Sequence, residues 1–165
     1  MEMCSVITES GMDFIGDNVF HIEKTPLYAS LMGVRSVEFI RCMDDKLIFV
    51  EAKTTFTNPD NPVESNYTKF LVEIDEICEK FIHSINVYSS IVVGANDEPM
   101  LECFYPPANV FIRFVLVIRT HKKEWCKPVY AKIMETLPSH FKQIWKPEVQ
   151  VINHETAFQQ RLTIS

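Results

Sequence analysis

The sequence predicts an α/β fold, a three-layer sandwich in which a mixed central sheet is flanked by helices. Residues 110–119 form an almost continuous run of apolar, largely β-branched side chains, which is typical of a central strand covered on both faces. Residues 66–92 repeat apolar positions at spacings of three and four, which indicates a long amphipathic helix. Strand and helix patterns alternate along the chain, as they do in α/β proteins.

The length and composition are those of one globular domain. The chain has 165 residues, of which 47% are apolar and 23% are charged, so we expect residues 1–165 to form a single domain. No apolar run reaches the ~18 residues that span a bilayer. The first residues lack the basic region of a secretory signal, so we expect a cytoplasmic protein with no membrane partner. The five cysteines are widely spaced without a CxxC motif, which favours free thiols over a zinc site.

The N-terminal part has a weak pattern followed by clearer elements. Residues 1–16 are expected to form a short helix or a loose N-terminal arm, and residues 18–22 a short strand or the lead into a helix. Thr25 and Pro26 have the residue types of an N-cap and a first helical position, which predicts a helix over residues 23–31. The elements expected next are strands over residues 34–42 and 47–55, a turn-rich loop over 57–65 and the long helix over 66–92.

The C-terminal part is expected to complete the sheet. A loop over residues 94–108 contains Pro99, Pro106 and Pro107 and precedes the apolar strand. The last expected elements are an amphipathic helix over residues 127–145 with an interruption at Pro138, a strand over 149–153 and a short helix over 154–162.

The two strands before the long helix place three charged residues together. If their hairpin closes with Met43 opposite Lys46, Glu38 falls opposite Glu51. The side-chain period of two also puts Glu51 and Lys53 on one face of their strand. A three-residue turn would shift the register by one and put Glu38 on the other face.

Two opposed carboxylates need compensation. Directly paired side chains lie ~4.5–5.5 Å apart, where like charges repel. The strands are apolar along most of both faces, so lost hydration adds to the cost. Either one carboxyl stays protonated or a cation lies between the two, and Mg²⁺ or Mn²⁺ suits oxygen ligands on an open face. Lys53 beside them would stabilise charge on a phosphate or position a water. A Glu-x-Lys triplet also arises by chance on a solvated strand face.

Glu38, followed after twelve residues by Glu51-Ala52-Lys53, resembles the PD-(D/E)xK, or restriction-endonuclease-like, superfamily. The resemblance covers about residues 20–153 and implies a restriction-endonuclease-like core with a metal-dependent nuclease site. The first acid is Glu where the family pattern has Asp, and no proline precedes it. Family members often add an acid from the first helix, which implies Glu23 as a further metal ligand. An acid in the first turn of a helix is also favoured by the helix dipole, and both interpretations stay open.

The resemblance implies a Mg²⁺- or Mn²⁺-dependent endonuclease that hydrolyses phosphodiester bonds in DNA, with Glu38 and Glu51 as ligands and Lys53 as a catalytic residue. A homodimer would cut both strands. The basic residues between 119 and 132 would hold the nucleic acid, although the net charge is −6. The alternative is a catalytically inactive, nuclease-like binding or interaction module, and a third hypothesis is a hydrolase of small phosphoesters. On the long helix, Glu79, Lys80 and His83 are expected on the solvated face.

Overall fold

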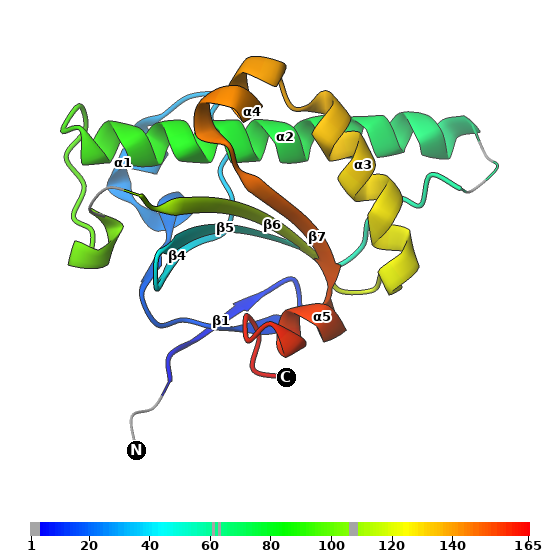
Figure 1. Ribbon diagram of the computed structural model, residues 1–165, viewed down its shortest axis with the longest axis horizontal. Helices are drawn as coiled ribbons and strands as arrows, with labels where there is room; N and C mark the ends of the chain where they lie inside the picture. Colours follow the sequence, from blue (N-terminus) through cyan, green and yellow to red (C-terminus); the bar gives the residue numbers. More distant parts are fainter. Residues whose placement is uncertain (1–3, 61, 63, 106–108) are drawn as a thin grey trace.

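A five-stranded mixed sheet forms the centre of the protein (Figure 1). The computed structural model describes residues 4–60, 62, 64–105 and 109–165, with the backbone alone at 64 and 65. The strand order is β3-β4-β5-β6-β7, with antiparallel neighbours from β3 to β5 and parallel neighbours from β5 to β7. The α/β class and the mixed sheet are therefore confirmed. The strands are β3 (Val19–Phe20), β4 (Phe39–Met43), β5 (Lys46–Lys53), β6 (Phe111–Ile118) and β7 (Glu148–Asn153).

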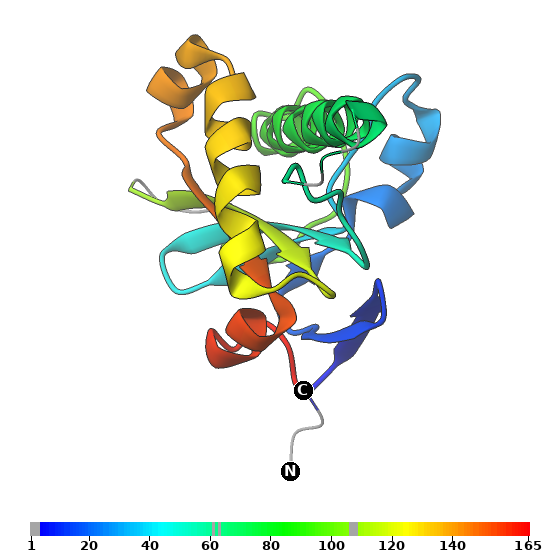
Figure 2. The same cartoon turned by 90° about the vertical axis from the view of Figure 1, so that its right-hand side faces the viewer.

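The long helix α2 (Glu64–Val92) lies across one face of the sheet, with α3 (Cys126–Thr136) and α4 (Ser139–Trp145) on the same side (Figures 1 and 2). Its buried stripe packs on aromatic side chains of the sheet, with the rings of Phe81 and Phe114 stacked at 4.7 Å. No helix in the described part of the chain is both long and apolar enough to cross a membrane. The buried stripe of α2 follows the predicted spacing and includes Phe70, Ile74, Ile77, Phe81 and Ile85.

The other face of the sheet is covered mainly by an N-terminal hairpin, together with the short helix α5 (His154–Gln159) (Figure 1). The expectation of a short helix or loose arm is wrong, because β1 (Val6–Glu9) pairs with β2 (Met12–Ile15). Ser10 and Gly11 form the turn with positive φ values of 51° and 74°, the signs that a type I′ hairpin turn requires. The second layer of helices is thus largely replaced by two short strands.

Several element boundaries differ from the prediction. The strand expected over residues 34–42 begins only at Phe39, because Val37 donates its backbone N–H to Ser84 Oγ of α2, at 2.8 Å, instead of joining the sheet. The helix expected over 127–145 ends before Pro138 and restarts after it, so the interruption is a full break. The terminal helix predicted to reach residue 162 stops at Gln159.

The first predicted helix divides in two. A 3-10 helix, η1 (Ile22–Lys24), precedes α1 (Pro26–Ser30), and Thr25 caps α1 by accepting a hydrogen bond from the backbone N–H of Tyr28 at 3.1 Å. The expected cap is therefore confirmed. The loop expected over 94–108 contains a further 3-10 helix, η2 (Glu102–Phe104). Pro106 and Pro107, which belong to the predicted loop, lie outside the described residues.

The β4–β5 hairpin has the predicted register. Met43 pairs with Lys46 and Phe39 with Val50, across a two-residue turn in which Asp44 has a φ of 54°. Phe39 is the first residue of β4 that pairs regularly with β5. Glu38, which precedes it in the sequence, donates its backbone N–H to Val50 O at 3.0 Å. The hairpin therefore brings Glu38 close to the last residues of β5, although Glu38 lies outside the regularly paired residues.

Phe114 is the most informative residue of the core for a stability test. Its buried ring lies 5.1 Å from the ring of Phe49 and 4.7 Å from that of Phe81. We expect Phe114→Ala to lower the free energy of unfolding by about 3–5 kcal/mol, because it leaves a cavity between sheet and helix. Phe111→Ala is the control on the same strand, where the side chain is 61% exposed. Urea unfolding should show a control change within about 0.5 kcal/mol, and equal losses would contradict this packing.

Candidate functional site

Glu51 is a fully buried carboxylate on the central strand β5. Its exposed fraction is 0%. Leu47 and Phe49 lie on the same face of β5 as Glu51, because side chains two residues apart share a face of a strand. Both pack in the core beneath α2. Glu51 thus continues an apolar row, where a charged carboxylate loses its hydration and needs a compensating partner.

Two lysines compensate Glu51 at the same oxygen. The Nζ atom of Lys80, on α2, donates a hydrogen bond to Oε1 of Glu51 at 2.7 Å. The Nζ atom of Lys53 lies 3.8 Å from that same oxygen. Oε2 of Glu51 is buried and has no hydrogen-bond partner among the described residues. One oxygen is therefore held by amines, and the other is left without a partner.

Burial and the mutual contact shift the pKa values of Glu51 and Lys80. Burial raises the pKa of Glu51 from 4.5 to about 7, although the positive charges of Lys80 and Lys53 act in the opposite direction. Burial alone would lower the pKa of Lys80, but the charge of Glu51 and the hydrogen bond to it outweigh burial and raise that pKa. Lys80 therefore stays an ammonium, while Glu51 gives up its proton less readily than a solvated carboxyl.

Glu38 is a second carboxyl with shifted ionisation. It is half-buried, and this burial raises its pKa from 4.5 to about 7, with the negative charge of Glu51 as the next largest cause. The charge of Glu9, on the N-terminal hairpin, raises the pKa of Glu38 further. The Glu38 backbone N–H donates to Val50 O, the residue before Glu51, so both glutamates lie at the same end of the hairpin. Glu9 was missed by sequence reasoning, because nothing in the sequence shows that the hairpin folds back over the sheet.

Glu23 lies at the edge of this site. It is on η1 and is exposed as a whole residue, but neighbouring atoms partly desolvate its carboxyl and raise its pKa, and the charges of Lys80 and Lys53 oppose that rise. Among the described residues, no three His, Cys, Asp or Glu side chains are grouped closely enough to hold a metal ion. Glu23 is thus near the two carboxyls without completing a three-ligand cluster in this conformation.

A chain of ion pairs leads from the site to the surface. Lys53 Nζ lies 3.6 Å from Glu76 Oε1, which is 4.0 Å from Arg35 Nη1. Arg35 also pairs with Glu79 at 3.8 Å and donates its backbone N–H to His83 Nδ1 at 3.1 Å. The side chains of α2 that face this edge of the sheet therefore form a charged border beside the apolar core.

The expected solvated position of Lys80 is wrong, because its side chain is only 12% exposed and contacts Glu51. The helical spacing contained the signal. Lys80 follows the buried Ile77 by three residues and precedes the buried Ser84 by four, so it lies on the border of the buried stripe. Glu79 is exposed, as expected.

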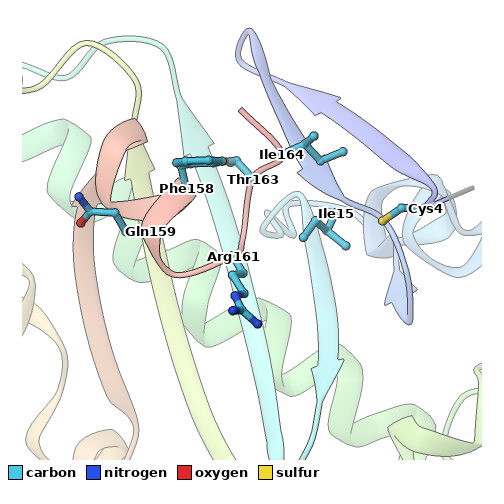
Figure 3. A pocket seen from close by; sticks show the side chains of 7 residues that line it. All are labelled: Cys4, Ile15, Phe158, Gln159, Arg161, Thr163 and Ile164. Carbon is cyan, nitrogen blue, oxygen red and sulfur yellow. The ribbon is translucent and has the colours of Figure 1, made fainter.

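A separate pocket of about 580 Å³ lies away from these residues, on the side of the sheet covered by the hairpin (Figure 3). Its wall comes from β2, α5 and the C-terminal segment, and Thr163 contributes a buried hydroxyl without a hydrogen-bond partner among the described residues. None of its lining residues belongs to the Glu51 site. They are Cys4, Ile15, Phe158, Gln159, Arg161, Thr163 and Ile164.

The raised pKa of Glu38 predicts a pH dependence of stability. A carboxyl with a pKa of about 7 in the folded state and an ordinary value of 4.5 binds more protons when folded, so stability falls as pH rises from about 4.5 to 7. Glu38→Gln removes this penalty. In urea unfolding with a chelator, we expect the variant to gain roughly 1–2 kcal/mol over wild type at pH 8, after discounting for solvent screening, and nothing at pH 4.5.

The exposed Glu102 provides the control for this measurement. Glu102→Gln should follow the wild-type pH profile. A Glu38→Gln difference that is the same at every pH contradicts the raised pKa.

No family model, curated protein or solved structure matches this chain at a significant level. The resemblance to the PD-(D/E)xK superfamily therefore stays a prediction, and the function of the site is inferred from its geometry.

Proposed function

We propose that the chain is a metal-dependent nuclease that hydrolyses phosphodiester bonds in DNA at the Glu51 site. The observation that carries the proposal is the buried Glu51 carboxylate, whose Oε2 has no hydrogen-bond partner among the described residues. Glu38 supplies a second carboxyl whose pKa is raised, and Lys53 an amine 3.8 Å from Oε1. Perturbed acids beside a specific cation are typical of functional sites.

The donor set fits a hard divalent cation. Carboxylate oxygens suit Mg²⁺ or Mn²⁺, and Mg²⁺ is commonly bound by one or two carboxylates together with waters and substrate phosphates. Glu51 and Glu38 would hold the ion, with Oε2 as the free donor of Glu51. Glu23 would join them only after its side chain moves, since the described residues contain no group of three such ligands.

The residues of the chain divide the remaining work. When bound, the divalent cation lowers the pKa of a coordinated water and offsets charge on the phosphate. Lys53, whose side chain is 30% exposed, can reach both the carboxylate and an entering substrate, and it stabilises negative charge on the phosphate oxygens. Glu76 keeps the Lys53 amine at the site by pairing with it at 3.6 Å.

The basic stretch between residues 119 and 132 begins beside the site. Arg119 donates its backbone N–H to Lys53 O at 2.9 Å, and the exposed Lys122 and Lys123 follow after two intervening residues. Lys122 Nζ lies 5.1 Å from the ring centre of Trp125, which places a cation and an aromatic ring together at the surface. These side chains would contact the phosphate backbone and supply the salt-dependent part of binding.

A homodimer that cuts both strands stays a prediction.

One observation favours the alternative of a catalytically inactive binding module. Lys80 neutralises Glu51 from within the protein at 2.7 Å, so the buried carboxylate is compensated without a metal ion. A module of this kind would bind nucleic acid or protein and would show no affinity for divalent cations at Glu51.

Substitutions at Glu51 and Lys53 test the nuclease proposal. We expect Mg²⁺- or Mn²⁺-dependent cleavage of plasmid DNA by wild type, and a loss of about 10²-fold or more in Glu51→Gln and Lys53→Ala, because they remove a ligand and a charge-stabilising group. The rate of cleavage is read from gels over a series of metal concentrations.

Matched controls on α2 make the same chemical changes at exposed positions, Asp75→Asn for the acid and Lys69→Ala for the lysine. Both should cleave like wild type. A wild type without cleavage and without metal-induced thermal stabilisation would support the binding module.

A further inference from the structure

Lys80 and Lys53 contact the same oxygen of Glu51 but are placed differently. The Lys80 amine is 2.7 Å from Oε1 and its side chain is 12% exposed, whereas the Lys53 amine is 3.8 Å away and its side chain is 30% exposed. Lys53 is also shared with Glu76. Lys80 is thus the buried partner in direct hydrogen-bond contact, and Lys53 is the looser and more accessible one.

We propose that Lys80 is a positioning residue, which holds Oε1 of Glu51 so that Oε2 stays free to bind the divalent cation. This inference rests on the proposed function. A carboxylate has two oxygens that exchange places by rotation, and a hydrogen bond to one of them fixes the plane of the group. The contact comes from α2, a helix packed along the sheet, so the position of the amine is set by the core.

The burial of Lys80 also argues against a role as a catalytic residue. Its amine is occupied by Glu51 and nearly covered, so it does not reach substrate in this arrangement. Without Lys80, Glu51 would keep Lys53 as its nearest amine and would draw it from Glu76 toward the carboxylate. Lys53 would then no longer face the substrate, and the cation would lose Glu51 as a ligand of fixed orientation.

The position of Lys80 indicates why a charged residue, and not a neutral one, stands beside Glu51. Lys80 lies on α2 between the buried side chains of Ile77 and Ser84. A buried ion pair as a whole adds little net stability, but removing one partner leaves the other charge without compensation. An ammonium at this place is therefore better explained by what it does to Glu51 than by packing alone.

The experiment measures Mn²⁺ binding by calorimetry in wild type, Lys80→Met, Lys80→Arg and the control Lys69→Met, which carries the same change at an exposed position of the same helix. Second-layer partners of metal ligands change affinity by about 10- to 100-fold, so we expect Lys80→Met to weaken Mn²⁺ binding by about 10-fold or more. Lys80→Arg should recover part of the affinity, since it restores a cationic donor. Lys69→Met should bind like wild type.

Thermal unfolding of each variant shows whether it is folded, and if Lys80→Met does not fold, Lys80→Gln takes its place, because its amide can occupy the same space without charge. Wild-type affinity in the folded neutral variant overturns the positioning role. Equal weakening in Lys80→Met and Lys80→Arg also overturns it, because it assigns the effect to packing. A wild type that binds no Mn²⁺, with Glu51→Gln indistinguishable from it, overturns the proposed function as well.

Discussion

The structure depends on one costly arrangement, a carboxylate buried under α2 at the end of an apolar row on β5. Glu51 is 0% exposed, and lost hydration raises its pKa to about 7 even with two lysines beside it. Natural cores rarely keep such a group unless it is paired, and pairing itself adds little net stability. The ammonium of Lys80 and the partly exposed Lys53 are the compensation that the fold supplies. Lys53 of β5 and Lys80 of α2, which are far apart in the sequence, thus both contact this single side chain.

Compensation on one oxygen only is what makes the arrangement chemically capable. If both oxygens of Glu51 were held by amines, the group would be an internal ion pair and nothing more. Because Oε2 has no hydrogen-bond partner among the described residues, it is the oxygen that would bind the cation in the proposed function. In the proposed site, Glu38 and the exposed Glu23 would offer further carboxyl oxygens, which are the ligands that Mg²⁺ prefers. The N-terminal hairpin closes this end of the sheet, with Ser10 Oγ donating to Ala52 O at 3.0 Å.

The sequence predicted those parts of the fold in which one signal dominates. The apolar run of β6 and the stripe of α2 are confirmed, because each rests on a strong local pattern. The pairing of Met43 with Lys46 is also observed, but the sequence left it open against a register shifted by one residue, since Asp44-Asp45 is not a favoured hairpin turn. The hairpin of residues 6–15 was missed, since two four-residue strands show too little periodicity to separate from a loose arm. The contact of Lys80 with Glu51 was missed because it depends on how α2 rotates over the sheet, which a border position on the helix leaves open.

Crystals grown or soaked with Mn²⁺ would show through anomalous diffraction at the manganese edge whether Glu51 binds a cation. We expect one strong anomalous peak beside Glu51 and Glu38, with Oε2 of Glu51 as a ligand and Lys80 still bound to Oε1. A map without a peak at Glu51 at millimolar Mn²⁺, with the carboxylate held by Lys80 and Lys53 alone, would contradict it. The buried acid would then be an internal ion pair, and a cation-dependent function would have to be sought elsewhere on the molecule.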